Sequence, residues 1–329
     1  MKRYSNLQCY VSKFENLEVH IFVIGYKNLG ESCIILYVDT GNSNKVVFSM
    51  VVDSYLQNNI NLAKVILSKY NVDKLNIVCW THPHHDHSLG IDDLVKDFYS
   101  DNLVFIRPDF YYGDKNIGLL KNECNKTIDI FSNILGCVSK KNLWPIKSSG
   151  GTGNCYQIDL ISENDNKIKD SDIFFLTPNI STLDWKAIYN ESLTSPNELS
   201  VSFVLSLDDY MFYFGGDTEN PNIKCCNQQL LKDIRWVKVP HHCSKTSNAL
   251  VYSLGDNLDY AVSTVFFKHN LPDKEIQDLY ANKTILYMTQ MAKEDKGKYG
   301  IVEFTYKFNI DGTTVDVTTY GNAYKYDEA

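Results

Sequence analysis

Hydrophobic and polar residues follow strand-like and helix-like patterns in the first third of the chain. Short runs rich in Val, Ile and Phe, separated by Gly and Asn, are typical of strands. A segment with helical spacing, Ile60 to Tyr70, precedes another apolar strand and an amphipathic helix. The predicted strands of this region are Glu18 to Ile24, Cys33 to Val38, Lys45 to Val52 and Leu75 to Trp80.

The remainder of the chain becomes irregular and then returns to strands. From Pro108 to about Asp170 the pattern predicts little beyond a helix near Asn116 to Leu135. A hairpin, alternating strands and helices, and two closing strands follow, the last pair being Gly300 to Phe308 and Thr313 to Thr319. This order predicts an α/β protein with two sheets packed face to face and helices outside. Since no repeat or flexible linker interrupts it, we expect one domain over residues 1–329.

Composition narrows the class of protein. The 329 residues are 44% hydrophobic and 13% aromatic, which is enough for a substantial core. The net charge of −8 argues against a broad surface that wraps nucleic acid. The nine cysteines include no C-x-x-C pair, a usage that fits a reducing compartment. No apolar stretch reaches the length of a membrane span, so we expect a cytoplasmic protein without membrane contact.

Six of the eight histidines lie in two clusters. Histidines at i and i+2, on a loop that leaves a buried strand, can point two imidazoles at one ion, and Asp86 and His87 then face a second point nearby. Imidazole and carboxylate ligands suit Zn²⁺, and also Mn²⁺ or Fe. We therefore predict two metal sites, with catalysis favoured over simple metal storage. The clustered histidines are His82, His84, His85, His87, His241 and His242.

The spacing His82-x-His84-x-Asp86-His87 resembles the H-x-H-x-D-H signature of the metallo-β-lactamase superfamily. This resemblance implies a four-layer αββα sandwich, with His82 and His84 on the first metal and Asp86 and His87 on the second. It also implies a two-zinc hydrolase in which Asp86 helps to move protons.

Further positions take roles from the same resemblance. Asp217, at the end of a predicted strand, matches the carboxylate that bridges both metals, and His241 matches the last ligand of the second metal. His242 is then a neighbour that contacts substrate or handles a proton. Asp53 matches an early aspartate that orients ligands. Asp39 is its rival, and we prefer Asp53 because Cys33 to Val38 resembles the strand before it.

Within the superfamily the chain is most similar to the ComEC-type domain found in DNA-uptake proteins. The resemblance runs from about Glu18 to Phe308, with an insertion at about residues 108–170, and the membrane part of those proteins has no counterpart here. The motifs that carry it are Asn197-x-x-Ser200, Gly216-Asp217-x-Glu219 and Val239-Pro240-His241-His242-x-Ser244.

Two departures from the family pattern affect the predicted site. No histidine lies between His87 and His241, so the first metal site lacks one ligand and is expected to be weak. Asn197 and Ser200 are the candidates for its place. Cys243 stands where the family has glycine, and we favour a small buried residue there over a thiolate ligand.

The expected reaction is attack by a metal-bound hydroxide on phosphorus or on a carbonyl carbon. The family resemblance favours a phosphodiesterase or nuclease, and the negative net charge favours single-stranded nucleic acid or a small phosphodiester. Ser244 and His269 are further candidates for substrate contacts. The alternatives are a hydrolase of esters, lactones, thioesters or β-lactams, for which Lys245 would anchor a carboxylate, and a non-catalytic metal-bound subunit or sensor of a larger complex.

Overall fold

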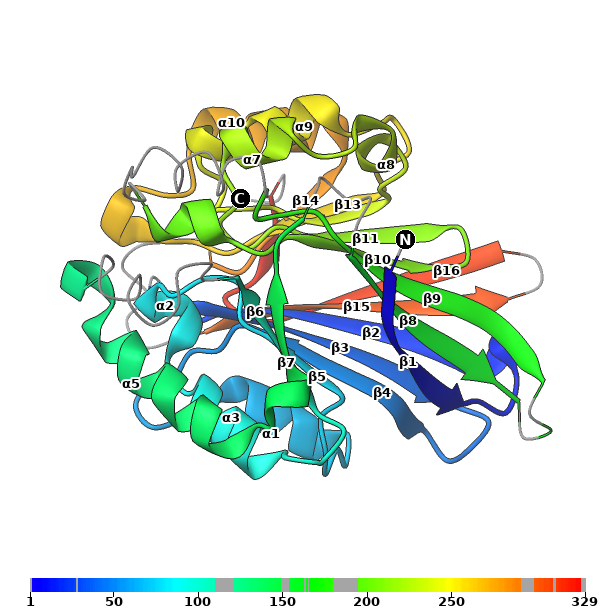
Figure 1. Ribbon diagram of the computed structural model, residues 1–329. Helices are drawn as coiled ribbons and strands as arrows, with labels where there is room; N and C mark the ends of the chain where they lie inside the picture. The colour runs from blue at the N-terminus through cyan, green and yellow to red at the C-terminus, as the bar shows by residue number, and fades with distance from the viewer. Residues whose placement is uncertain are drawn as a thin grey trace.

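The computed structural model describes residues 2–27, 29–109, 121–148, 154–162, 164, 166–179, 195–290, 299–309 and 312–326. Its strands form two large sheets that pack against each other between helices (Figure 1). The predicted α/β architecture with two sheets is therefore confirmed.

In the described part of the chain, nine strands make one sheet and eight make the other. The first sheet has the order β1 (Lys2–Tyr10), β8 (Asn154–Ile161), β9 (Lys167–Phe175), β10 (Phe203–Leu207), β11 (Tyr210–Phe214), β12 (Trp236–Lys238), β13 (Tyr260–Ser263), β14 (Ile285–Met288) and β17 (Tyr324–Lys325). The second has the order β16 (Gly312–Gly321), β15 (Gly300–Asn309), β2 (Leu17–Gly25), β3 (Glu31–Asp39), β4 (Lys45–Val52), β5 (Ile77–Cys79), β6 (Val104–Pro108) and β7 (Leu143–Ile146).

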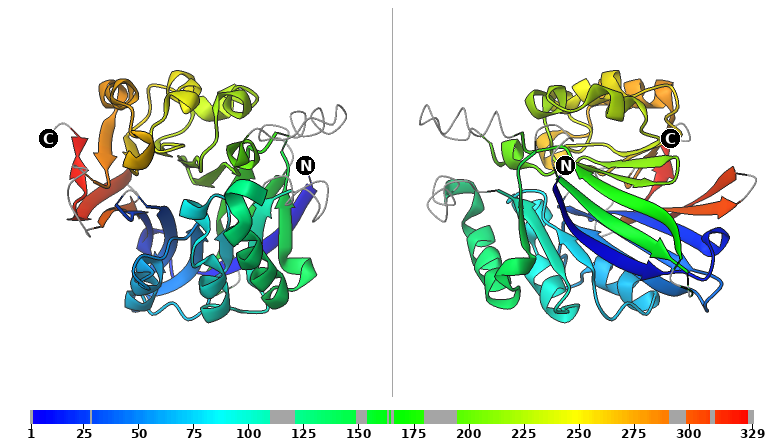
Figure 2. Two further views of the ribbon diagram at one scale, coloured as in Figure 1. Left: turned by 90° about the vertical axis from the view of Figure 1, so that its left-hand side faces the viewer. Right: turned by 45° about the vertical axis from the view of Figure 1, so that its right-hand side comes forward.

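The helices divide between the two outer faces. One group lies along the eight-stranded sheet: α1 (Leu62–Lys69), α3 (Ile91–Asp97) and α5 (Lys121–Cys137). The other lies over the nine-stranded sheet: α7 (Asn220–Lys224), α8 (Gln228–Lys232), α9 (Ala249–Ser253) and α10 (Lys274–Lys283). Figure 2 shows the same separation from two other directions. Among the residues described, no helix combines the length and the apolar character needed to cross a membrane.

The short helices are confined to connections. They are α2 (His85–Ser88), η1 (Phe14–Asn16), η2 (Lys140–Asn142), η3 (Pro196–Leu199), η4 (Lys245–Ser247) and η5 (Phe267–His269).

Burial on both faces explains why the central strands read as continuous apolar runs. Side chains alternate across a strand, so a strand covered on both sides needs apolar residues at every position. In β3, one set of side chains joins the core between the sheets and the other joins the core under the helices. The first set is Cys33, Ile35 and Tyr37, and the second is Ile34, Leu36 and Val38.

The segment predicted as an insertion, residues 108–170, contributes strands to both sheets. Its β7 pairs with β6 at the edge of the eight-stranded sheet, and its β8 lies between β1 and β9 in the other sheet. The helix predicted at 116–135 is observed as α5, at Lys121–Cys137. Residues 110–120 lie outside the described part of the chain. Strands β1, β7, β8 and β17 were not predicted from the hydrophobic pattern.

Candidate metal centre

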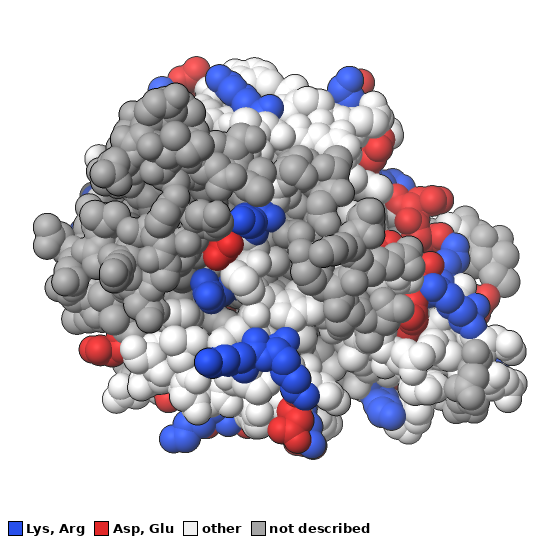
Figure 3. Space-filling view, in the orientation of Figure 1, with Lys and Arg blue, Asp and Glu red and all other residues white. Residues whose placement is uncertain are grey.

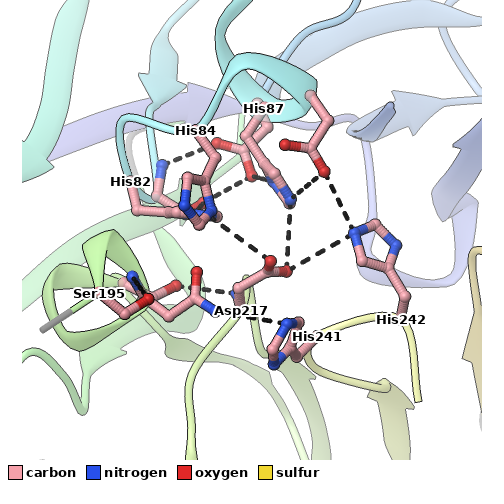
Figure 4. A network of polar contacts seen from close by, with 12 residues as sticks. His82, His84, His87, Ser195, Asp217, His241 and His242 are labelled. Carbon is pink, nitrogen blue, oxygen red and sulfur yellow. Dashed lines mark hydrogen bonds and ion pairs between the residues drawn. The ribbon is translucent and has the colours of Figure 1, made fainter. Parts of the chain in front are cut away.

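The candidate site lies where parallel strands of both sheets end. Strands β4, β5 and β6 are parallel in one sheet, and β11, β12 and β13 are parallel in the other. Asp53 follows β4, His82 follows β5, Asp217 follows β11, His242 follows β12 and Thr264 follows β13. Because the carboxyl ends of parallel strands share one edge, residues far apart in sequence converge at this edge (Figure 4).

The backbone is left-handed at the turns that aim these side chains. Asp53 has φ 56°, and three successive non-glycine residues after β12, namely His241, His242 and Cys243, have φ 49°, 48° and 65°. Such conformations are costly outside glycine and are found where surrounding structure holds them in place. The turn after β12 points the two adjacent imidazoles to different places.

Four possible ligand atoms from three segments of the chain lie close together. His87 Nε2 lies 3.6 Å from Asp86 Oδ2 and 3.3 Å from Asp217 Oδ1. His242 Nε2 lies 3.4 Å from Asp86 Oδ2 and 4.0 Å from Asp217 Oδ1. A tetrahedral zinc ion with ligands at about 2.1 Å separates those ligand atoms by about 3.4 Å. These four contacts, of 3.3 to 4.0 Å, are close to the separation expected between two ligands of one zinc ion.

Hydrogen bonds on the far side of each imidazole determine which nitrogen is free. His87 Nδ1 donates to Asp53 Oδ2 at 2.7 Å. His82 Nδ1 donates to the Thr81 hydroxyl at 3.0 Å, and that hydroxyl donates to Asp53 at 2.6 Å. His242 Nδ1 donates to the Thr264 hydroxyl at 2.9 Å. Each Nε2 is then left with a lone pair directed into the site.

The inward-facing atoms lack a hydrogen-bond partner. His87 Nε2, His242 Nε2 and Asp217 Oδ1 are buried, and none of them bonds to another described group. Lone pairs of two imidazoles and two carboxylates cannot satisfy one another, and buried polar atoms without partners are costly. A cation in their midst would satisfy all of them, so the donor set fits a divalent metal ion.

The buried carboxylates of the site also favour a bound cation. Burial favours neutral imidazole at His87, but Asp217, Asp86 and other carboxylates outweigh it and raise the pKa of His87 well above its usual value. Burial would raise the pKa of Asp217, yet His87 and His242 hold this pKa well below the usual value. Burial raises the pKa of Asp53, whereas its three hydrogen bonds from His87 and Thr81 favour the charged form.

A second set of donors lies on the other side of Asp217. His82 Nε2 is 3.6 Å from Asp217 Oδ2 and 2.9 Å from His84 Nδ1. His82 is fully buried, and burial together with the neighbouring His87 lowers the pKa of His82 well below its usual value. Asp217 thus lies between the two groups of imidazoles, the position predicted for a bridging carboxylate. This second group offers fewer metal ligands than the first group, formed by Asp86, His87, Asp217 and His242.

The two candidates for the missing ligand behave differently. Ser200 Oγ accepts a hydrogen bond from the Asp217 backbone N–H at 2.9 Å, so this hydroxyl positions the aspartate. Asn197 holds Glu219 and His241 with its amide nitrogen, at 3.4 Å and 3.3 Å. The Asn197 carbonyl oxygen is buried without a partner among the described residues. Of the two side chains, Asn197 is therefore the better candidate for the missing ligand of the first metal.

The geometry favours His242 over His241 as the ligand beside Asp86 and Asp217. His242, predicted to contact substrate or handle a proton, lies with Asp86 and Asp217, and both of its ring nitrogens are engaged or directed there. His241, predicted as the last ligand, stays close enough to Asp217 for this carboxylate to help outweigh burial and raise the pKa of His241, but the ring's Nδ1 lies 3.3 Å from Glu219 and its Nε2 faces the Asn197 amide. The reason is the left-handed backbone of the turn, which separates the two rings.

Three other predicted residues have clear places. Ser244 Oγ caps the short helix η4 by accepting from the Thr246 N–H, instead of facing the site. Cys243 is buried in the apolar core beneath α9 and α10, where burial raises the pKa of its thiol. Lys245, considered as a carboxylate anchor, pairs with Asp273 and Glu275.

A buried ion pair behind His242 was not predicted. The Lys238 ammonium pairs with Glu31, and these side chains are 2% and 3% exposed. The Thr264 hydroxyl, which accepts a hydrogen bond from His242 Nδ1, donates a hydrogen bond to Glu31. Glu31 also lies near His87, and the group Glu31, His87 and His242 has the spacing to hold a metal ion. Because Lys238 already neutralises Glu31, this group orients His242 instead of binding a second cation. The available signal was a lysine inside the apolar strand before the histidine pair.

An open cavity of about 780 Å³ leads to the ligand atoms. Its walls come from both sheets and include Tyr55, His84, Asp86, Asn197, Phe266 and His269. His269, predicted as a candidate for substrate contact, therefore lies in the cavity wall. The site has the room and the access that a small-molecule substrate needs.

No protein-family model matches this sequence, and no curated protein is detectably similar to it.

Proposed function

We propose that this protein is a metal-dependent phosphodiesterase with the metallo-β-lactamase fold. The observation that carries the proposal is the group of inward-facing, unpartnered ligand atoms at the floor of an open cavity. A cation bound there would polarise a substrate oxygen and acidify a coordinated water. Zinc fits the donor set best, with Mn²⁺ or Fe as alternatives.

The arrangement of the chain supports the fold assignment. Two sheets lie between two groups of helices, and the candidate ligands follow the carboxyl ends of strands in both sheets. The H-x-H-x-D-H motif follows β5, Asp217 follows β11 and the histidine pair follows β12. This is the order that the family resemblance implies for a four-layer αββα sandwich.

We revise one ligand relative to the sequence-based assignment. His242 takes the place of His241 with Asp86, His87 and Asp217 at the second metal, since only His242 presents a ring nitrogen to both carboxylates. We therefore withdraw the predicted role of His242 in moving protons, because neither of its ring nitrogens is available. His82, His84 and Asp217 remain the ligands proposed for the first metal.

Buried negative charge supports metal binding. Glu31, Asp53, Asp86 and Asp217 bring four carboxylates to the site and Lys238 brings one ammonium, all with side chains 14% exposed or less. With neutral imidazoles, three net negative charges remain. Two divalent cations would leave one positive charge, which a metal-bound hydroxide would cancel. Because buried charge needs such compensation, the site favours bound cations, and the preference for a phosphodiester rests on the family resemblance.

The net charge of −8 favours a small or single-stranded substrate over a long duplex. On the face seen in Figure 3, the described Lys and Arg side chains lie singly or in small groups beside Asp and Glu, without one continuous basic patch. Proteins that bind many phosphates of a duplex rely on such patches. Lys245 is occupied by Asp273 and Glu275, which weakens the case for a β-lactam carboxylate.

The test is a substrate panel run with zinc and then with manganese. It includes bis-p-nitrophenyl phosphate, single-stranded DNA, RNA, a cyclic dinucleotide, nitrocefin and a thioester. Asp217→Asn is the inactive variant, and Asp316→Asn, at an exposed carboxylate, is its matched control. We expect turnover of at least one phosphodiester that Asp217→Asn abolishes and Asp316→Asn keeps. Turnover of nitrocefin or thioester alone would favour a carbon-centred hydrolase, and no turnover would favour a non-catalytic metal-bound subunit.

A further inference from the structure

Three aromatic rings form two stacked pairs that share Phe266 and connect the ligand atoms to the cavity wall. The His242 ring stacks on Phe266 with centroids 5.1 Å apart and planes 20° apart. Phe266 stacks in turn on His269, again at 5.1 Å and with planes 15° apart. Both Phe266 and His269 line the cavity. The row therefore links a proposed metal ligand to a surface that substrate can reach.

The outer end of this row is open. Phe266 is half-buried, while His269 is exposed although one face of its ring rests on Phe266. Burial therefore does not account for the parallel arrangement of His269. An exposed planar ring held parallel to a fixed neighbour is a preformed platform for another flat ring.

A positive charge stands beside the platform. Lys268 precedes His269 in η5, is exposed and also lines the cavity. No described carboxylate pairs with Lys268, in contrast to Lys245 and Lys274, which form ion pairs with acidic neighbours. Its charge is thus available to an anionic group next to the stacked ring.

We propose that His269, supported by Phe266 and flanked by Lys268, is a nucleobase-stacking subsite for the group attached to the scissile phosphate. This rests on the proposed phosphodiesterase function and narrows its substrate to nucleotide-type phosphodiesters. A planar base and a phosphate on one molecule match a ring platform and a metal site in one cavity. Stacking recognises the flat face that all bases share, so the subsite accepts several bases.

The experiment compares two substrates with the same leaving group. Thymidine 5′-(p-nitrophenyl phosphate) carries a base, and methyl p-nitrophenyl phosphate does not. We expect the wild-type kcat/KM to favour the thymidine ester by roughly 5- to 150-fold, the contribution of one stacked base. His269→Ala should abolish this preference and His269→Tyr, which keeps a planar ring, should retain it. Tyr252→Ala, at an exposed aromatic residue that does not line the cavity, is the matched control.

A binding measurement makes the subsite testable without turnover. Stacking quenches the fluorescence of 2-aminopurine riboside 5′-monophosphate, so wild-type protein and His269→Tyr should quench it and His269→Ala should not. Equal cleavage of both esters by the wild type would overturn the subsite and leave the phosphodiesterase standing. Cleavage of neither ester would count against the phosphodiesterase, and the quenching result would then decide the subsite alone. Equal quenching by wild type and His269→Ala would overturn it.

Discussion

Replacing Lys238 by methionine should destabilise the protein by about 3–5 kcal/mol, the cost of removing one partner from a buried ion pair. The Lys238 and Glu31 side chains are 2% and 3% exposed, and methionine fills similar space without charge. Glu31 would then stay buried without its counter-ion. Although burial favours a neutral lysine, Glu31 outweighs this effect and raises the pKa of Lys238. The structure thus holds both groups charged.

The remaining contacts of Glu31 place the expected cost toward the lower end of that range. The Thr264 hydroxyl still donates to Glu31 in the variant, and the Nδ1 atoms of His242 and His87 lie 3.4 Å and 3.8 Å from its oxygens. Hydrogen bonds to a charged group contribute about 1.5–3 kcal/mol each, so part of the stabilisation survives. Because Thr264 also accepts the hydrogen bond that orients His242, the same variant should weaken metal binding.

The assay is urea unfolding of the metal-free protein, so that metal binding does not add to stability. The midpoint should fall at unchanged slope. Lys307 and Asp316 form an exposed pair at 2.7 Å, with side chains 42% and 67% exposed, and provide the matched control. Lys307→Met should cost less than about 1 kcal/mol. The double variant Lys238→Met with Glu31→Gln should lose less stability than the sum of the losses in its two single variants. A Lys238→Met midpoint equal to that of Lys307→Met, or strict additivity in the double variant, would refute the reasoning.

Three further outcomes are expected. His242→Ala should lose about one equivalent of bound metal whereas His241→Ala should not, as measured by elemental analysis; the reverse pattern would restore the sequence-based assignment. Asp217→Ala should lose the stabilisation by zinc that chelators remove from the wild type, seen as a melting temperature that no longer responds to zinc. In native protein, Cys137 and Cys225 should react with a thiol reagent before the buried cysteines, because both are exposed; labelling of buried thiols at the same rate, located by mass spectrometry, would show a looser core.

Much of the candidate ligand set could be proposed from sequence because its residues are close together along the chain. His82, His84, Asp86 and His87 lie within six residues of one another, in the turn after β5 and in the short helix α2, so their spacing alone brings them to one region. Asp217 could be chosen because it ends a strand of a recognisable hairpin, which the structure shows as β10 and β11.

The choice between His241 and His242 could not be made from sequence. Adjacent residues in an irregular turn point wherever their dihedral angles send them, and here both are left-handed. The structure likewise separates Asp53, which holds His87, from its rival Asp39, which accepts hydrogen bonds from Ser12 at another place.

The remaining features could not be predicted because they depend on pairing between residues far apart in the sequence. Glu31 and Lys238 are 207 positions apart, and neither residue carries a local signal for its partner. Strand β1 pairs in parallel with β8, which lies in the segment predicted as an insertion. Parallel pairing between distant segments leaves no turn between the strands, so the hairpin signals that revealed β10 and β11 do not exist for them.

The central claim, a metal ion held by Asp86, His87, Asp217 and His242, is tested most directly by anomalous diffraction. Crystals grown without added metal would be measured on both sides of the zinc absorption edge, and on both sides of the manganese and iron edges. The account predicts a peak at one edge within about 2.3 Å of His87 Nε2 and His242 Nε2, as ligand distances require. A site without any peak, or with a peak beside Glu31 and Lys238 instead, would contradict it.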